Sequence, residues 1–426
     1  MIYIGIIMHN LSIRNQISGI IGNLLEHYDT ALFGLLAPFL APIFFTDKDP
    51  LNALILTYGI LCSGILTRPI GALFFGWIGD TFGRKQALSL SLLGMSFVTI
   101  SIGFLPTYQE VGVYAPIFLA LGKILQSFFA AGESIGGAIF VLEHTSQKQQ
   151  SLFSSLYDTS AIGGMLIASA IVACMNQYTH LENTWRSLFW AGGITAIIGF
   201  YLRWNNITND KQNSFQENLS FFSVLRLNRK VFISIVIASG FSYAIYSLAF
   251  SLLNGYIPLI TSFSKITMMQ INTILLAIDM FLLPIFGFLS NKFGREKIMM
   301  TGAILFSICV IPLFVVLKNA SFALIIFVRL MITIFGVAFS ATYHAWTISI
   351  TGYRYRYLII ALAYSIGSQC IGMPTSSICL WLYKITNWSG APGIYLMFLG
   401  LLAFIALYIP KQKTIFLKPE VEIIKT

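Results

Sequence analysis

Ionisable side chains lie inside long apolar stretches of this sequence, where they are the groups best placed to do chemistry. A charge is costly to bury in hydrocarbon, so each one is a candidate for ligand binding or proton transfer. A carboxylate whose surroundings change with conformation can take up and release a proton, and a buried base can hold an anionic group. The acids and bases in such positions are Glu26, Asp29, Arg68, Lys123, Glu133, Asp279 and Arg329.

Three of these charges are expected at a similar depth. Asp29 is roughly 16 Å from the inner end of its apolar run, and Arg68 and Glu133 are each roughly 15 Å from theirs, from the helical rise per residue. We expect these three to meet near the membrane midplane, where a carboxylate can exchange a proton as its partner moves. The alternative is a static ion cluster that only stabilises the bundle. The residues assigned to proton coupling are Asp29, Glu26 and Glu133, since Glu26 shares a helix face with Asp29.

The composition indicates that membrane helices position these side chains. Hydrophobic residues make up 57% of the chain and charged residues 10%, whereas soluble domains carry about 25% charged residues. The net charge is +10, but most Lys and Arg lie in the predicted cytoplasmic loops and termini. The basic character is therefore a topology signal and not a nucleic-acid-binding surface. The five cysteines lie in apolar runs without the spacing of a metal or redox site.

Twelve apolar runs approach or exceed the length of about 20 residues that a spanning helix needs. They lie near 18–45, 52–78, 86–106, 114–142, 152–176, 186–204, 231–262, 267–290, 298–317, 320–344, 355–383 and 391–409. The expected fold is an all-α polytopic membrane protein with 12 transmembrane helices in two six-helix halves. The predicted parts are a half at 1–204, a cytoplasmic linker at 205–230, a half at 231–410 and a cytoplasmic tail at 411–426. Both termini are expected in the cytoplasm, no cleavable signal is evident, and Met1 or Met8 could be the start.

A charged, glycine-rich corner occurs twice, once in each half. The first copy, Gly76–Lys85, reads GWIGDTFGRK, and the second, Gly287–Arg295, reads GFLSNKFGR. The charges must lie in water at a membrane face, and the glycines permit a tight turn. Asp80 of the first copy is replaced by Asn291 in the second. Two copies at equivalent places indicate two similar halves, as many secondary transporters have.

The first corner resembles the loop between helices 2 and 3 of the major facilitator superfamily. The stretch 22–29, GNLLEHYD, resembles the helix-1 signature of its metabolite:proton symporter family, with His27 in place of the usual tryptophan. Further matches are Arg68-Pro69-Ile70-Gly71, then Lys123 and Gln126, then Gly132-Glu133 and Gly136, then Trp185-Arg186. Within that family the chain is most similar to proline/betaine-type carriers.

The resemblance implies a proton-coupled symporter that imports a small zwitterionic osmolyte or amino acid by alternating access. It implies no cofactor, a proton gradient as the driving force, a bacterial inner-membrane location and a monomeric functional unit. A di- or tricarboxylate or shikimate carrier of the same family is the alternative. A channel or receptor would not explain the paired corners, and no catalytic constellation of an enzyme is evident. His27, Asp158 and His344 are interpreted as structural residues rather than proton carriers.

The resemblance also implies a gate at the cytoplasmic side. Arg84 is expected to pair with Glu143, and Asp80 to meet the positively polarised end of a helix that begins near Arg354. The alternative is a corner that only fixes the topology. The residues assigned to the gate are Gly76, Asp80, Gly83, Arg84, Glu143, Gly287, Gly294 and Arg295.

Arg68 and Asp279 occupy equivalent positions in the two repeats, because each precedes the first glycine of its corner by the same number of residues. We expect them to face each other across a central cavity and to hold the carboxylate and the cationic end of a zwitterion. Tyr243 and Tyr246 could add a cation–π face. A dicarboxylate would instead recruit two of the buried bases, and a structural ion pair between Arg68 and Asp279 is a further alternative. The residues assigned to substrate binding are Arg68, Asp279, Lys123, Arg329, Tyr243 and Tyr246.

Overall fold

Helices account for most of the residues whose positions the structure describes. The computed structural model describes residues 2–45, 64–178, 181–206, 221–318, 320–352 and 355–409, and this part of the chain contains no strand. Nine helical segments in these ranges are long and apolar enough to cross a bilayer. The predicted all-α polytopic architecture is therefore confirmed. Met1, residues 207–220 of the predicted linker and the predicted tail lie outside the described residues.

The long helices of the N-terminal half follow the first six predicted runs. They are α1 (Ile2–Phe44), α3 (Gly64–Thr81), α4 (Arg84–Gly103), α6 (Tyr114–Glu143), α7 (Gln150–Tyr178) and α8 (Leu181–Asn206). Two short helices join them, α5 (Tyr108–Val111) before α6 and α9 (Phe221–Leu227) in the predicted linker. The prediction began α1 too late, because it counted only the apolar run and the helix continues back to Ile2.

The C-terminal half has more helical segments than predicted runs, because three of its runs are interrupted. Its segments are α10 (Arg229–Ser247), η1 (Leu248–Leu252), α11 (Leu253–Ile260), α12 (Lys265–Phe293), α13 (Arg295–Val316), α14 (Phe322–Ser340), α15 (Tyr343–Ile350), α16 (Arg356–Ile366), η2 (Gly367–Gly372), α17 (Thr375–Thr386) and α18 (Ala391–Tyr408). Both η segments are π-helices, which have a widened turn. η2 precedes Pro374, whose missing N–H cannot continue a helical hydrogen-bond ladder.

The two corners have similar backbone geometry at the glycine that directly precedes the arginine of each corner. Gly83 precedes α4 with φ of 107°, and Gly294 precedes α13 with φ of 92°. Only glycine takes such angles without steric cost, so each turn depends on its missing side chain. The expected tight glycine turns are confirmed at both places.

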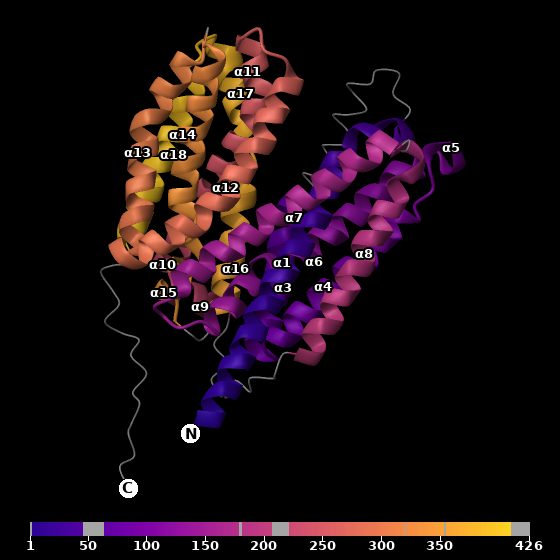
Figure 1. Ribbon diagram of the computed structural model, residues 1–426, viewed down its shortest axis with the longest axis vertical. Coiled ribbons are helices and arrows are strands. Elements are labelled where there is room, and N and C mark those ends of the chain that lie inside the picture. Colours follow the sequence, from indigo (N-terminus) through magenta and orange to yellow (C-terminus); the bar gives the residue numbers. More distant parts are fainter. Residues whose placement is uncertain are drawn as a thin grey trace.

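The two halves form two bundles that meet along repeat-related pairs of helices (Figure 1). α3 packs against α16, and α7 packs against α12. Figure 1 shows the ribbons of the two bundles close together at the end that holds the start of α1 and the helices α9, α15 and α16, and spreading toward the opposite end. We call the first of these ends the loop end, since the gate contacts described below lie there.

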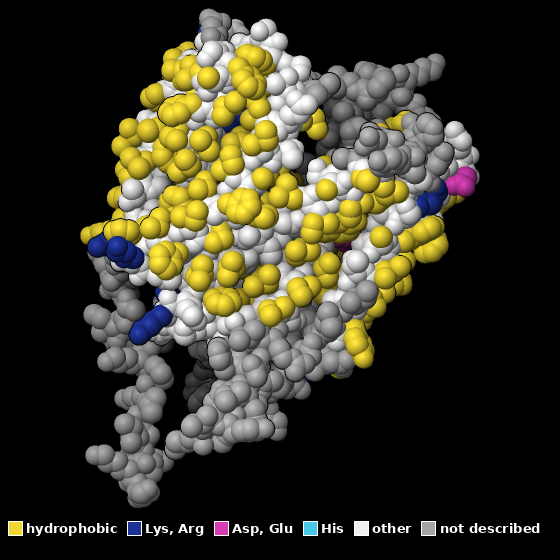
Figure 2. Space-filling model, viewed as in Figure 1, with side chains coloured by type: hydrophobic (Ala, Val, Ile, Leu, Met, Phe, Trp, Pro, Cys, Tyr) yellow, Lys and Arg dark blue, Asp and Glu magenta, His cyan; other side chains and the backbone are white. Residues whose placement is uncertain are grey.

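Each bundle has its own apolar core and an apolar outer surface. In the C-terminal half, the Phe241 ring packs edge-on against Phe306 and Phe339, with centroids 5.5 and 4.8 Å apart. Large side chains such as Phe97, Phe281 and Ile308 are exposed. Figure 2 shows hydrophobic side chains across the visible face of both bundles, with basic side chains near its edges. This distribution suits a protein whose outer surface contacts lipid.

Candidate functional site

The carboxylate that pairs with Arg68 belongs to Glu26. Glu26 Oε1 of α1 lies 3.6 Å from Arg68 Nη2 of α3, and Glu26 Oε2 lies 2.9 Å from His27 Nδ1. His27 Nδ1 is also 2.9 Å from the carbonyl oxygen of Asn23. The Glu26 side chain is 1% exposed and the Arg68 side chain 19%. The acid is therefore fully enclosed, while the guanidinium reaches a small pocket.

Asp29 belongs to a second polar network, between α1, α4 and α6. Thr99 Oγ1 donates a hydrogen bond to Asp29 Oδ2, and Gln126 Nε2 donates to the same oxygen at 3.0 Å. Lys123 Nζ donates to the Gln126 Oε1 atom and lies 4.5 Å from the centroid of the Phe33 ring. The four polar side chains are all buried. A buried acid and a buried base are thus connected through one amide.

Asp29 does not meet Arg68 as expected, since no ion pair joins them within the part of the chain that the structure describes. Two positions three residues apart differ by about 60° around a helix axis. Glu26 consequently faces α3, whereas Asp29 faces α4 and α6. Depth alone could not separate the two acids, because they differ in direction rather than in level.

Glu133 lies fully buried on α6, close to α7. A Cβ atom added to Gly137 would lie 3.2 Å from Glu133 Oε1 and 2.6 Å from the Tyr157 hydroxyl. That hydroxyl donates to the Glu133 carbonyl oxygen at 3.1 Å. Ser134, the residue after Glu133, lines the Arg68 pocket. The assignment of Glu133, Glu26 and Asp29 to proton coupling stays a prediction.

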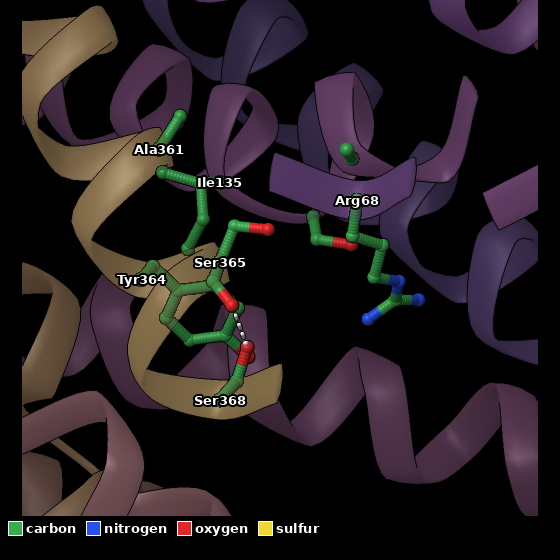
Figure 3. Close-up of a pocket in the computed structure, with 8 residues that line it drawn as sticks. Arg68, Ile135, Ala361, Tyr364, Ser365 and Ser368 are labelled. Carbon is green, nitrogen blue, oxygen red and sulfur yellow. Dashed lines mark hydrogen bonds between the residues drawn. The ribbon is translucent and has the colours of Figure 1, made fainter. Parts of the chain in front are cut away.

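The pocket beside Arg68 lies between the two halves. Its walls are Arg68, Ala131, Ser134, Ile135, Ala361, Tyr364, Ser365 and Ser368, from α3, α6, α16 and η2. Figure 3 shows Arg68 on one side and Tyr364, Ser365 and Ser368 on the opposite side. The cavity volume is about 10 Å³, which is about the space of one water molecule. The base, the hydroxyls and the ring form a polar wall that suits a carboxylate-bearing ligand, once the pocket enlarges.

Asp279 is buried on α12 and receives a hydrogen bond from α10. Tyr246 donates its hydroxyl to the carboxylate, 3.2 Å from Oδ1 and 3.4 Å from Oδ2. Tyr243, one turn earlier, packs against η2, where a Cβ on Gly372 would lie 2.5 Å from the Tyr243 Cβ. Among the described ion pairs, none joins Asp279 to Arg68, so the alternative of a structural pair between them is wrong for this conformation.

Arg329 has the contacts of a structural residue, which argues against its assignment to the substrate. It is fully buried on α14. Its guanidinium donates to the Met268 carbonyl at 3.0 Å, to the Ala249 carbonyl at 3.1 Å and to Asn272 Oδ1 at 2.8 Å. Ala249 lies in η1, where the widened turn displaces the regular helical bonding. Arg329 therefore joins α14 to η1 and α12 within one half.

We expect Arg329→Met to destabilise the protein without changing its ligand affinity. Removing the guanidinium leaves buried acceptors without their donor, at a cost of about 1–3 kcal/mol each where no other donor replaces it. A decrease of several degrees in the thermal unfolding midpoint of the purified protein would show the effect. The midpoint of Arg329→Lys should lie between those of the parent protein and Arg329→Met. An unchanged midpoint together with lost ligand binding would restore Arg329 to the substrate site.

The first corner joins the two halves through an ionic network at the loop end. Asp80 accepts hydrogen bonds from the backbone N–H groups of Tyr357 at 3.3 Å and Leu358 at 2.9 Å, both in the first turn of α16. Arg84 Nη1 lies 2.5 Å from Asp80 Oδ1. The expected contact of Asp80 with a helix N-terminus is present, and the helix begins at Arg356.

Glu143 connects this corner to a second arginine across the interface. Arg84 Nε lies 3.2 Å from Glu143 Oε2, as expected from the sequence, and Arg356 Nη1 lies 3.1 Å from Glu143 Oε1. Tyr357 donates its hydroxyl to the carbonyl oxygen of Gly132 on α6. One acid of the N-terminal half thus holds one arginine from each half.

The contact of α16 with the N-terminal half is closely packed because the N-terminal half presents glycines to it. A Cβ atom on Gly76 would lie 2.8 Å from Leu358 Cα, and one on Gly79 would lie 2.1 Å from a ring carbon of Tyr357. A Cβ on Gly136 of α6 would lie 1.9 Å from the Tyr357 hydroxyl. We refer to these three glycines with Tyr357 and Leu358 as the glycine seam. Their lack of side chains lets the halves approach this closely.

The second corner makes different contacts at the equivalent place. A Cβ on Gly287 of α12 would lie 2.1 Å from Ser155 Oγ of α7, so this glycine also permits close contact between the halves. Arg295 donates to the carbonyl oxygen of Ala345 at 2.7 Å, within its own half. Among the described residues, the second corner, which lacks the acid, therefore contacts the other half by packing and not through an ionic network.

Several polar residues near these sites were not identified from the sequence. Thr99, Ser134, Tyr364, Ser365 and Ser368 lie beside the buried charges, but hydroxyls are common in membrane helices and carry no spacing signal. His27 and the pair Asp158–His344 were interpreted as structural, although the first contacts Glu26 and the second joins the halves. The contact of His344 with an acid of another helix is not visible in a single sequence, whereas Glu26 directly precedes His27 and only the orientation of the two side chains needed the structure.

Two repeat-related helical halves with buried charges between them, and an ionic seal at one end, define a secondary transporter rather than an enzyme. Solved structures agree on the fold. The proton:xylose symporter XylE superposes with a TM-score of 0.75 over 94% of this chain and 96% of that one, at 15% identity. A bacterial homologue of the iron transporter ferroportin in an outward-facing state gives 0.73 over 93% and 99%, at 14% identity.

Family models and curated relatives give the same assignment. The model described as "Sugar (and other) transporter" matches residues 16–206, and the model described as "Major Facilitator Superfamily" matches residues 239–422. The chain belongs to the major facilitator superfamily. It is 27% identical to the proline/betaine transporter of Salmonella typhimurium, over 90% of this chain and 80% of the relative. It is 26% identical, with the same coverage, to the glycine betaine/proline/ectoine/pipecolic acid transporter OusA of Dickeya dadantii.

Proposed function

We propose that the protein is a proton-coupled symporter that imports a small zwitterion of the proline or betaine type. Its relatives that transport proline and betaine match nearly the whole chain. We further propose that a single chain is the functional unit, that it lies in a bacterial inner membrane, and that both termini and the loop end face the cytoplasm. A di- or tricarboxylate carrier is the alternative within the same superfamily.

The observation that carries the zwitterion proposal is the separation of opposite charges at the interface between the halves. Arg68 reaches a pocket walled by hydroxyls and Tyr364, while Asp279 lies buried with Tyr246 in the other half. Arg68 is paired with Glu26 and not with Asp279, so a zwitterion that set its carboxylate on Arg68 would share that guanidinium with Glu26, while its cationic end would meet Asp279. A dicarboxylate would find the Asp279 carboxylate repulsive, because like charges at short range raise the free energy of binding.

The closed loop end supports alternating access as the mechanism. The ionic network of Asp80, Arg84, Glu143 and Arg356 joins the halves at that end. The pocket at Arg68 is too small for proline or betaine in this conformation. Binding therefore requires the bundles to move relative to each other, which would expose the pocket to one side of the membrane at a time.

Transport by reconstituted vesicles tests the proposal directly. Labelled betaine or proline should accumulate in proteoliposomes when an inward proton gradient is imposed, and should only equilibrate when a protonophore removes it. Accumulation of 2-oxoglutarate or citrate in place of either zwitterion would favour the alternative. Conductance without saturation would indicate a channel and contradict a carrier.

We expect Asp279→Asn to lower betaine and proline uptake by about tenfold or more, because the cationic end of the substrate loses a buried counter-charge. Tyr246→Phe is the matched control, since it removes one hydrogen bond and keeps both the ring and the carboxylate. Uptake in that variant should fall much less. Unchanged uptake by Asp279→Asn, or better transport of a dicarboxylate by the parent protein, would contradict the zwitterion site.

A further inference from the structure

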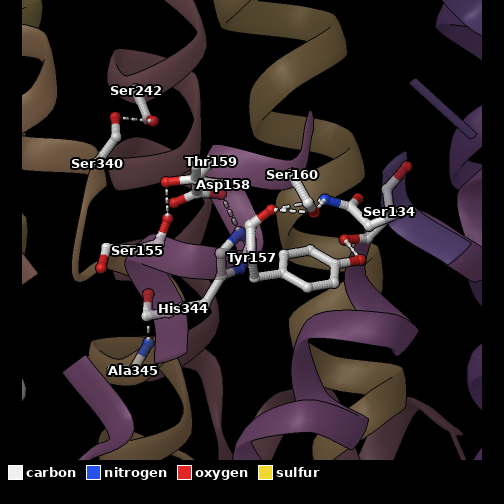
Figure 4. A network of polar contacts seen from close by, with 12 residues as sticks. Ser134, Ser155, Tyr157, Asp158, Thr159, Ser160, Ser242, Ser340, His344 and Ala345 are labelled. Atoms are coloured by element: carbon white, nitrogen blue, oxygen red, sulfur yellow. Dashed lines mark hydrogen bonds and ion pairs between the residues drawn. The ribbon is translucent and has the colours of Figure 1, made fainter. Parts of the chain in front are cut away.

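A histidine and an aspartate join the two halves beside the second corner. His344 Nε2 of α15 lies 3.1 Å from Asp158 Oδ1 of α7 (Figure 4). The backbone N–H of the next residue, Ala345, donates to Ser154 Oγ of the same α7 at 3.4 Å. The pair is largely buried, with the His344 side chain 9% exposed and the Asp158 side chain 22%. It is a polar contact that must break if the halves separate at this end.

The groups around the pair make its charge state important. Asp158 Oδ2 is buried and accepts no hydrogen bond within the described part of the chain. Asp158 interacts electrostatically with Asp279 and Tyr246, which lie on α12 and α10. The rings that contact His344 are those of Tyr157 on α7, of Tyr343 on its own helix α15 and of Tyr364 on α16. Arg295 of α13 donates to the carbonyl oxygen of the next residue, Ala345. The acid that contacts His344 therefore interacts with a second buried acid, Asp279.

We propose that a proton on His344 holds the two halves together at the cytoplasmic end, so that this pair sets how readily the carrier opens inward. Histidine is the side chain that ordinarily changes charge between about pH 5 and pH 8. As an imidazolium it forms a charge-assisted hydrogen bond with Asp158, which is stronger than the bond that a neutral imidazole makes. The ionic network at the first corner consists of arginines and carboxylates, so it supplies no comparable group.

The direction of the effect follows from which state contains the contact. The pair is formed while the loop end is closed, so protonation stabilises the closed state and loss of the proton favours opening. Acidification of the cytoplasm would slow inward opening, and alkalinisation would speed it. This inference rests on the proposed alternating-access function and on the proposed cytoplasmic position of the loop end.

Exchange of labelled betaine across proteoliposomes at equal pH on both sides tests the proposal. We expect the exchange rate of the parent protein to fall about fivefold between about pH 8 and about pH 6, beyond the fall in His344→Gln, which keeps a hydrogen bond but carries no charge. His144→Gln is the matched control. His144 also lies near this end, but its ring contacts the Phe140 carbonyl within its own helix. That control should keep the pH dependence of the parent protein.

A conformational measurement separates this inference from the proposed function. Spin labels on the ends of α7 and α15 report the closed fraction without any substrate. We expect the closed fraction of the parent protein to rise as the pH falls, and His344→Gln and Asp158→Asn to abolish that rise. A closed fraction that changes equally in parent and variants would overturn the inference, even if transport is normal. If the closed fraction depends on pH in this way but the protein transports no zwitterion, the inference about His344 and Asp158 is supported and the proposed substrate is contradicted.

Discussion

Asp80→Asn should reduce transport by about tenfold while leaving the amount of protein in the membrane unchanged. Asp80 is the acid that accepts two backbone N–H groups at the start of α16 and also contacts Arg84. A negative charge at a helix N-terminus contributes up to about 2 kcal/mol in a partly buried position, and asparagine supplies none of it. The closed state would therefore lose population. Initial uptake rates, normalised to the protein detected by immunoblot, measure the effect.

The second corner provides the control for this prediction. Asn291 occupies the place of Asp80 in the repeat and is exposed, so Asn291→Ala should leave transport close to that of the parent protein. Normal transport by Asp80→Asn would end the claim that the first corner is a gate, and would leave it as a turn that fixes the topology. A loss in both variants would point to a general effect of these corners on folding.

Neutralising the coupling acid should abolish accumulation against a gradient while preserving exchange. Glu26→Gln removes the negative charge that contacts both Arg68 and His27, and Asp29→Asn replaces the carboxylate that accepts from Thr99 and Gln126 with a neutral amide. Without a titratable group the carrier can still move its substrate, but the proton gradient no longer drives it. We expect the accumulation ratio to fall to about one, while counterflow remains above about a third of the parent rate.

Comparison among three acids identifies the coupling group. Glu133→Gln tests the third candidate, and Glu110→Gln, at an exposed capping box beside Thr107, is the control that should accumulate substrate normally. The acid whose neutral variant alone uncouples transport is the coupling group. Continued accumulation in all three buried variants would place the group elsewhere in the chain.

Much of the fold could be predicted from the sequence, because bilayer thickness sets a minimum length for each apolar run. The repeat of the corner revealed the two halves, and the glycines at 83 and 294 predicted turns that the structure contains. The interruptions at η1, η2 and between α14 and α15 could not be predicted. A π-turn leaves a backbone carbonyl that needs a donor from a neighbouring helix, as Arg329 donates to the Ala249 carbonyl. Composition does not show which neighbour supplies that donor.

The site could be predicted by residue but not by partner. Each assigned charge other than those of the second corner lies buried or between helices, and the contacts of Arg84 with Glu143 and of Asp80 with α16 are those expected. The carboxylate that pairs with Arg68 depends on the rotation of α1 about its axis. The groups that Arg329 bonds depend on tertiary packing. Pairs formed across the halves, such as Asp158 with His344, join residues too far apart in the chain for a single sequence to connect.

The glycine seam makes ligand affinity depend on the size of side chains that lie outside the binding site. A methyl group at Gly79 would overlap the Tyr357 ring only while α3 and α16 are together. Such a substitution penalises one state of the carrier and leaves the other untouched. If only the closed state presents its site to the outside, the affinity measured there falls in proportion to the fraction of molecules still closed. A single added carbon atom at Gly79 would thus lower the affinity for a substrate that it does not contact.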